Sequence, residues 1–191
     1  EGGITPTIPA DARVVRVFSS DSAFAALLND GSLVCWGNQN NGGECNRNPA
    51  VKDKVKSGVR FVAATAFAMV AVKEDGTAAV WGDKHFGADI TAVRDDLSGI
   101  ISIESGYRQF AALCSGGRVV QWSGCDPTWS EASCKAHNAG VVVMSGAIQI
   151  SVAMVGGAAL LASGEVVSWY SSPPSSDKDR LGPGSGIVEI F

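Results

Sequence analysis

Apolar and polar residues alternate along the chain in a pattern that returns four times. In its first copy an apolar run at 24–28 leads into Asn29-Asp30-Gly31, and a second run follows at 32–36. Two strand-like runs joined by an Asp-Gly turn predict a β-hairpin, because glycine readily adopts the positive φ that such a turn needs. Alternating apolar residues at 14–18 predict a further strand before the hairpin. We therefore expect strands near 14–18, 24–28 and 32–36, and their equivalents in the other copies.

The hairpin recurs at a nearly constant spacing. Each turn glycine precedes a tryptophan by five residues, and successive tryptophans are 45, 41 and 47 residues apart. The pairs are Gly31 and Trp36, Gly76 and Trp81, Gly117 and Trp122, and Gly164 and Trp169. Such a period is typical of repeat architectures. The predicted domain is a single one, 1–191, with repeats at about 14–58, 59–99, 100–146 and 147–186; residues 187–191 begin a fifth repeat or form a closing strand.

The middle run of each repeat is apolar nearly throughout. The four runs lie at 24–28, 69–72, 110–113 and 158–161. A strand that is apolar on both faces is covered on both faces, and no segment has a convincing helical period. Small sheets packed face to face make a propeller. The sequence therefore predicts an all-β, propeller-type repeat domain of about four blades plus one extra strand, either a partial or a small propeller.

Composition and charge narrow the choice of partners. The chain has 191 residues, is 46% hydrophobic and 18% charged, and carries a formal net charge of -4. It can bury a core, and it lacks the excess of basic residues that nucleic-acid binding favours. No apolar run reaches the roughly 18 residues of a membrane-spanning helix. We expect protein partners, no nucleic acid, and membrane association only through a partner.

Side chains able to support catalysis or to bind a metal are scattered. His85 and His137 each stand alone in an expected loop, and Cys125, Cys134 and His137 lack a fourth zinc ligand. The glycine-rich stretch 182–186 feeds a strand, whereas a phosphate site needs a helix N-terminus. We therefore predict no catalytic residue, no metal site and no cofactor.

The five cysteines fall into two groups. Cys35 and Cys114 lie in apolar strand-like runs and are expected to be buried, inert thiols. Cys45, Cys125 and Cys134 lie in expected loops. We predict a disulfide between Cys125 and Cys134, because eight residues separate them and a bridge would stabilise the loop. Pairing of Cys45 with either residue, or three reduced thiols, are the alternatives.

The loop between Cys125 and Cys134 contains a tryptophan outside the repeat pattern. Packing of the blades does not obviously require Trp129, because no other repeat has a second tryptophan. Exposed aromatic side chains are frequent binding hot spots. We expect Trp129 to bind a partner; the alternative is that it caps one end of a blade. A disulfide here would indicate an oxidising compartment or an organellar lumen, and a cytoplasmic location is the alternative.

The hairpin sequence resembles the repeat of the regulator-of-chromosome-condensation family. Its two clearest copies are Ala26-Leu27-Leu28-Asn29-Asp30-Gly31-Ser32-Leu33-Val34-Cys35-Trp36-Gly37 and Ala71-Val72-Lys73-Glu74-Asp75-Gly76-Thr77-Ala78-Ala79-Val80-Trp81-Gly82. The resemblance implies a β-propeller, usually of seven blades. The family includes nucleotide exchange factors, ubiquitin-ligase accessory domains and a secreted inhibitor of β-lactamases. Many members carry His-Thr where this chain has Ala23-Phe24, so the resemblance is to a divergent branch.

These observations predict a non-catalytic module that binds another protein through loops on a rigid scaffold. One alternative is a structural or accessory subunit of a larger assembly, in an organelle or at a membrane, which the incomplete repeats at both ends favour. The other is a regulator similar to guanine nucleotide exchange factors, which the missing His-Thr pairs disfavour.

Overall fold

The structure is a computed structural model that describes residues 6–46, 48–125, 128, 141–154, 156–170 and 180–181. Its described elements are β-strands and three short 3-10 helices. The prediction of an all-β chain is therefore confirmed. None of its described helices is long and apolar enough to cross a membrane.

The strands form four antiparallel sheets, which we call blades 1 to 4 in chain order. Blade 1 contains β1 (Val14–Ser19), β2 (Ala23–Leu28) and β3 (Leu33–Gly37). Blade 2 contains β4 (Val59–Ala64), β5 (Ala68–Lys73) and β6 (Ala78–Gly82). Blade 3 contains β7 (Ile100–Ser105), β8 (Gln109–Cys114), β9 (Arg118–Ser123) and β10 (Val141–Val143). Blade 4 contains β11 (Ala147–Val152), β12 (Gly156–Leu161), β13 (Val166–Tyr170) and β14 (Arg180–Leu181).

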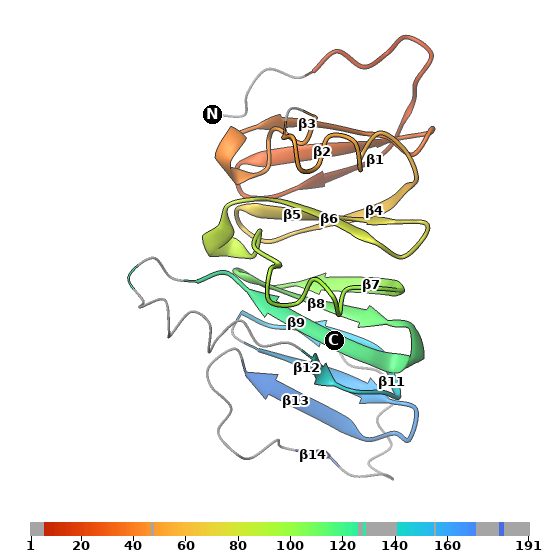
Figure 1. The fold of residues 1–191 in the computed structure, drawn as a ribbon, viewed down its shortest axis with the longest axis vertical. Coiled ribbons are helices and arrows are strands. Elements are labelled where there is room, and N and C mark those ends of the chain that lie inside the picture. The colour runs from red at the N-terminus through yellow and green to blue at the C-terminus, as the bar shows by residue number, and fades with distance from the viewer. Residues whose placement is uncertain are drawn as a thin grey trace.

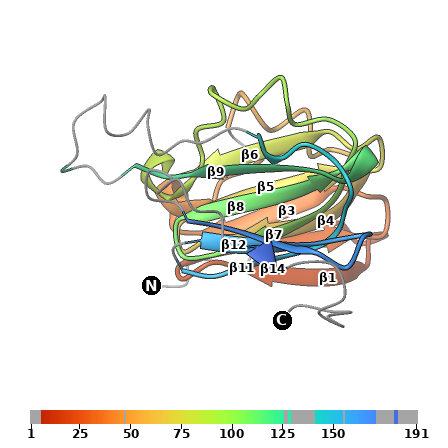
Figure 2. The same ribbon diagram turned by 90° about the horizontal axis from the view of Figure 1, so that it is seen from below.

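The blades are stacked face to face in the order in which they occur in the chain, with blade 1 at one end (Figure 1). Viewed along the stack, the sheets lie over one another (Figure 2). Short 3-10 helices follow the last strand of the first two blades: η1 (Gln39–Asn41) after β3 and η2 (Lys84–Phe86) after β6. A third, η3 (Ser115–Gly117), lies at the hairpin turn of blade 3.

The predicted hairpin turns are present at Gly31, Gly76, Gly117 and Gly164, and the first two are Asp-Gly turns. The four turn glycines have φ between 75° and 83°, a region that favours glycine. In the first turn the Asp30 carboxylate accepts hydrogen bonds from the Ser32 backbone N–H at 2.9 Å and the Ser32 hydroxyl at 2.6 Å. Asp75 accepts the same two bonds from Thr77. These hydrogen bonds lower the pKa of both carboxyl groups and tie each turn to the strand that follows.

The hydrophobic core lies between the blades. Successive residues of a middle strand point into different cores, because side chains alternate across a strand. In β5, Ala71 belongs to the core shared by blades 1 and 2, whereas Val70 and Val72 belong to the core shared by blades 2 and 3. The prediction that the middle strands are covered on both faces is confirmed for β5 and β8.

One prediction about the cysteines is wrong. Cys35 is not a thiol: it forms a disulfide with Cys45, with the two Cα atoms 5.6 Å apart. Both residues reach the core between blades 1 and 2, because the chain after η1 folds back over β3. The second repeat has Val80 and Ile90 at the same spacing, and both pack against the next core. The disulfide thus stands where the second repeat has an apolar pair.

The other cysteines follow the predictions as far as they are described. Cys114 is a free, buried thiol, as expected. Cys125 is disulfide-bonded. Its expected partner Cys134 lies outside the described residues, as does Trp129. The pairing of Cys125 with Cys134 and the binding role of Trp129 therefore stay predictions, as does the strand expected at 187–191.

Candidate protein-interaction surface

Neighbouring blades are joined by the indole groups of the repeat tryptophans. Trp81 Nε1 of blade 2 donates a hydrogen bond to the carbonyl oxygen of Gly42 at 2.8 Å. Trp122 Nε1 of blade 3 donates to the carbonyl oxygen of Gly87 at 2.9 Å. Each glycine lies six residues after the tryptophan of the preceding blade and ends a 3-10 helix with φ above 100°. The first two blades therefore present a glycine carbonyl to the tryptophan of the next blade.

The acceptor positions favour glycine for two reasons. Their positive φ strains other residues. A Cβ atom at Gly42 would also lie 3.2 Å from Met69 Cγ, and one at Gly87 would lie 3.0 Å from Phe110 Cδ2. The close approach of the glycine to the next blade is what brings its carbonyl oxygen to the indole.

The joint between blades 3 and 4 departs from this pattern. Thr128 stands six residues after Trp122, in the insertion of the third repeat. Trp169 Nε1 is buried and has no hydrogen-bond partner among the described residues. Here the buried Gln109 side chain joins the blades instead, because its Nε2 donates to the carbonyl oxygens of Ala153 at 2.8 Å and Gly156 at 3.0 Å.

Main-chain hydrogen bonds complete the joints. The Val59 N–H of β4 donates to the turn carbonyl of Gly31 in blade 1 at 2.9 Å, and the Ile100 N–H of β7 donates to that of Gly76 in blade 2 at 2.9 Å. At the opposite end of the strands, the Asp21 N–H of blade 1 donates to the carbonyl of Ala66 in blade 2 at 3.0 Å. Each joint is thus polar at its margins and apolar between them.

Blade 1 exposes a face that the other blades bury. Val17 of β1 is 53% exposed, whereas its equivalents 19 residues before each later tryptophan are 5 to 7% exposed. Those equivalents are Val62, Ile103 and Ile150. Val14 is 45% exposed, and its equivalent Val59 is 4% exposed. Phe24, Val34 and Trp36 are half-buried on this face. We call Val14, Val17, Phe24, Val34 and Trp36 the outer face of blade 1.

A neighbouring position shows that this exposure is specific to the outer face. Val15 of β1 is 64% exposed, but its equivalents Ile101 and Ile148 are also 52% and 59% exposed. That position is exposed in every repeat, Arg60 included, so its exposure needs no partner. Val14 and Val17 differ, because the same positions in blades 2 to 4 are covered by the preceding blade.

The aromatic pair on the outer face has a buried counterpart. The rings of Phe24 and Trp36 are stacked with centroids 5.3 Å apart. Phe110 and Trp122 are stacked in the same way at 5.2 Å, fully buried between blades 2 and 3. No acceptor for Trp36 Nε1 is found in the part of the chain that the structure describes. The outer face therefore carries the same stacked aromatic pair that blade 3 buries against blade 2.

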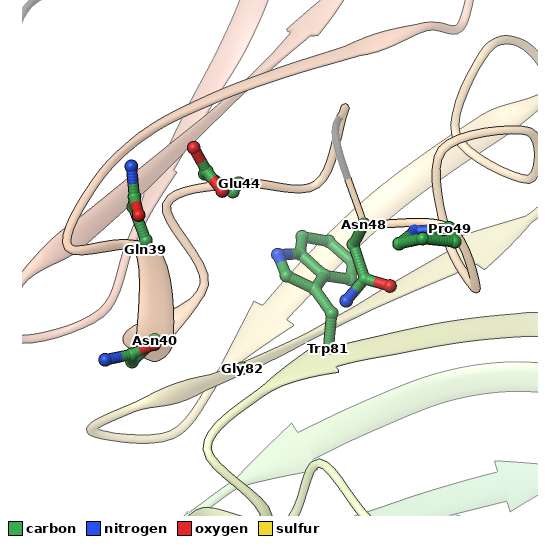
Figure 3. Close-up of a pocket in the computed structure, with 7 residues that line it drawn as sticks. All are labelled: Gln39, Asn40, Glu44, Asn48, Pro49, Trp81 and Gly82. Atoms are coloured by element: carbon green, nitrogen blue, oxygen red, sulfur yellow. The ribbon is translucent and has the colours of Figure 1, made fainter.

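A second feature is a polar cavity of about 420 Å³ between the loop after β3 and the end of β6 (Figure 3). Its lining includes Gln39, Asn40, Glu44, Asn48, Pro49 and Trp81. Trp81 is only 3% exposed and its indole N–H is already bonded, so it offers no free aromatic face. The cavity offers amide and carboxylate groups for hydrogen bonding and lacks a nucleophile with a partnering base.

The remaining candidate residues are distributed over the structure. Trp81, Trp122 and Trp169 are buried between blades, whereas Trp36 lies on the outer face of blade 1. His85 Nδ1 lies 3.0 Å from Asp83 Oδ1 within η2, a local contact at the end of β6. Among the described residues no group of three or more metal-ligating side chains is gathered. The outer face was missed from the sequence because Val17 and Val62 look equivalent until their neighbours are known.

Comparison with known proteins supports the resemblance of the hairpin. A family model for the regulator of chromosome condensation (RCC1) repeat matches residues 14–42. No curated protein sequence matches the chain.

Solved structures share the fold at low sequence identity. Prp20p of Saccharomyces cerevisiae, studied for its binding to Gsp1p and histones, has a TM-score of 0.54 and 17% identity, covering 86% of this chain and 47% of that one. Human WBSCR16 has a TM-score of 0.55 and 17% identity, with coverages of 86% and 50%. The CRINKLY ectodomain of the Arabidopsis thaliana receptor kinase ACR4 has a TM-score of 0.52 and 15% identity, with coverages of 88% and 55%.

The chain spans about half the length of these structures. At such identities the likeness is one of fold, and it agrees with the stacked blades and with the repeat matched at the first hairpin. The chain therefore carries an RCC1-type repeat and has the β-propeller-type fold of RCC1-like proteins.

Proposed function

We propose that the chain is a non-catalytic protein-interaction module that works as a subunit of a larger assembly, and that the outer face of blade 1 is its principal binding surface. The observation that carries this proposal is the exposure of Val14 and Val17, whose equivalents in blades 2 to 4 are buried. Contiguous apolar surface of this kind marks interaction sites on soluble proteins.

Two further observations support this role. A sheet edge and face left open invite association, so proteins usually cover them. Structural neighbours of the same fold bind proteins: Prp20p was studied with Gsp1p and histones, and also in complex with Kap60. A rigid stack of blades is suited to hold such a surface in one shape.

Size-exclusion chromatography with light scattering tests the proposal. The tagged protein, isolated from its natural source under native conditions, should have a mass well above that of one copy of its own polypeptide, as measured on the denatured protein. Val17→Glu should release the chain from the complex, because it places a charge in the centre of an apolar interface. Val15→Glu is the matched control and should leave the complex intact. A monomer in every case would contradict the proposal, as would equal effects of both variants.

A further inference from the structure

We propose that blade 2 has an interaction surface of its own at the free edge of β6, the edge that faces away from β5. The surface binds a short extended segment of a protein partner, which adds to the blade as an antiparallel strand. It lies on a different element from the outer face of blade 1, so the inference goes beyond the proposed function. The main-chain groups of β6 carry the argument.

The register of the hairpin in blade 2 identifies the groups that form this edge. Where the hairpin closes, the Lys73 N–H donates to the Thr77 carbonyl oxygen at 2.9 Å. Hydrogen-bonded and non-hydrogen-bonded pairs alternate along an antiparallel ladder. Ala78 and Val80 therefore direct their N–H and C=O groups away from β5. These groups have no hydrogen-bond partner in the part of the chain that the structure describes, and both residues are half-buried.

The equivalent edge of β3 in blade 1 is closed. Leu33 and Cys35 hold the places of those two residues, counted back from the repeat tryptophan. The Leu33 N–H donates to the Val55 carbonyl oxygen at 2.9 Å. The Asn46 side chain donates to the Leu33 carbonyl oxygen at 2.8 Å and accepts from the Cys35 N–H at 3.1 Å. The Asn46 amide thus makes the hydrogen bonds that a neighbouring strand would make.

Blades 3 and 4 close the same edge with a fourth strand. β10 pairs antiparallel with β9 at Val119 and Val120, and β14 pairs antiparallel with β13 at Val166 and Val167. These residues stand three and two positions before the tryptophan of their blade. Within the described ranges, blade 2 is therefore the one blade of four whose edge is left unpaired at this position.

The chain between blades 2 and 3 explains why this edge is open. It runs over 83–99 and is four residues shorter than the segment 38–58 between blades 1 and 2. Its main-chain hydrogen bonds close local turns, for example from the Val93 N–H to the Ile90 carbonyl and from the Leu97 N–H to the Val93 carbonyl. Among the described residues it makes no such bond to the free edge of β6.

The two residues that close the edge in blade 1 have no substitute in blade 2. Thr91 corresponds to Asn46, ten residues after the tryptophan, and within the described chain its shorter side chain makes no hydrogen bond to β6. Asp96 corresponds to Val55, four residues before the next blade. Its carbonyl oxygen accepts a hydrogen bond from Arg118 Nη2 at 2.6 Å, so it serves blade 3 instead. The groups of β6 are therefore available to a strand from another chain.

The chemistry of the occupant follows from the strands that close the equivalent edges. β10 consists of three valines, of which Val143 is buried, and Leu181 of β14 stands opposite Val166. An extended segment with β-branched or other large apolar residues and without proline matches this pairing. Main-chain hydrogen bonds supply affinity in such complexes, and the side chains that face the core supply specificity.

Amide hydrogen exchange of the isolated chain tests whether the edge is open. The Ala78 and Val80 amides should exchange about tenfold faster or more than the Leu33 and Cys35 amides, because only the second pair is hydrogen-bonded. Equal protection of the two pairs would overturn the inference, because a segment of the chain itself would then occupy the edge.

Proline at position 78 tests the edge without a large effect on the fold. Ala78→Pro removes an N–H that is unbonded among the described residues, so it should lower the melting temperature by less than about 3 °C. Leu33→Pro removes a bonded N–H and should lower it by about 10 °C or more. Similar losses in both variants would show that the two edges are equally closed, which contradicts the inference.

Photo-cross-linking in the natural source tests for the partner strand. A photo-reactive phenylalanine analogue replaces Thr77, which is exposed beside the edge, and should form a cross-link to a partner protein. Ala78→Pro should reduce that cross-link about tenfold or more, because it removes a main-chain donor and blocks the approach of a strand. Ala78→Val is the matched control: it keeps the N–H and should leave the cross-link unchanged.

The outcomes distinguish this inference from the proposed function. If no cross-link forms, or if Ala78→Pro and Ala78→Val give the same yield, the inference is overturned whatever Val17→Glu does to the natural complex. If Ala78→Pro abolishes the cross-link while the complex survives Val17→Glu, the edge of β6 binds the partner and the proposed function fails.

Discussion

Tryptophans at the same repeat position have different surroundings in this molecule. Trp122 is buried and its indole N–H is bonded to Gly87. Trp169 is buried, and its indole N–H has no partner among the described residues. Trp36 is half-buried on the outer face of blade 1. The contribution of each residue to stability is therefore decided by the blade beside it and not by its place in the repeat.

This difference predicts unequal effects of one substitution. Trp122→Phe removes a buried donor, leaves the Gly87 carbonyl unpaired and opens space in the core, so it should lower the free energy of unfolding by roughly 2–4 kcal/mol. Trp36→Phe should cost less than about 1 kcal/mol. Urea unfolding of both variants measures the difference. If both variants lose the same free energy of unfolding, the contact of Trp122 with blade 2 does not stabilise the stack of blades.

The turn carboxylates predict a dependence on pH. Hydrogen bonds from Thr77 lower the pKa of Asp75 in the folded chain. The stability that its ionised form contributes is therefore present at neutral pH and is lost as the pH falls through that lowered pKa. Carbon-13 NMR titration should place the Asp75 pKa below the usual carboxyl range, and the stability gap between wild type and Asp75→Asn should narrow in acid. If the difference in stability between wild type and Asp75→Asn does not change as the pH falls, the hydrogen bonds from Thr77 do not stabilise the ionised form of Asp75.

At the scale of elements, the disulfide Cys35–Cys45 fixes the loop between β3 and β4 that contacts blade 2. It closes a loop with a sequence separation of 10 that contains η1 and Gly42, the acceptor for Trp81. In the chain-entropy model a loop of this size contributes roughly 3 kcal/mol. The disulfide therefore stabilises both its own loop and the contact between blades 1 and 2.

Replacement of both cysteines tests this role. Cys35→Ala with Cys45→Ala should lower the free energy of unfolding by about 3 kcal/mol or more, since it also removes core volume. Cys35→Val with Cys45→Ile copies the second repeat and should recover part of the loss. Urea unfolding under non-reducing conditions compares the two. An alanine variant as stable as the wild type would show that the disulfide is dispensable.

The reactivity of the cysteines towards alkylating reagents gives a separate prediction. Cys114 is free and buried, and burial raises its pKa, so native protein should react slowly with alkylating reagents until it unfolds. Tryptic mapping without reduction should recover a linked Cys35–Cys45 pair, and the same map checks the predicted link between Cys125 and Cys134. Rapid native labelling of Cys35 or Cys45 would contradict the structure.

How far the sequence predicts the elements can be seen at particular residues. The five-residue step from Gly76 to Trp81 sufficed to place β5 and β6, because a turn glycine and alternating strands are local features. The Cys35–Cys45 disulfide was not predicted, because Cys35 reads as a core residue by itself. Comparison with Val80 and Ile90, ten residues apart in the second repeat, was the available signal. The exposure of the outer face depends on the neighbours of blade 1 in space, which no local pattern records.

At the scale of the molecule, blades 2 and 3 each lie between two other blades, whereas among the described blades only blade 2 packs against blade 1 (Figure 1). Each internal joint combines an apolar centre with hydrogen bonds at its margins. Because the outer face of blade 1 exposes apolar positions that the later blades bury, we expect the partner to bind at this end of the stack. The polar cavity near Trp81 lies beside an internal joint and would stay open in such an assembly.

Hydrogen–deuterium exchange of the isolated chain and of its natural complex tests this central claim most directly. Peptides that cover 14–19 and 33–37 should exchange more slowly in the complex, because the partner covers the outer face. Peptides from β5, already buried on both faces, should be unchanged. Protection that spares 14–19 and falls on other parts of the chain would contradict the account.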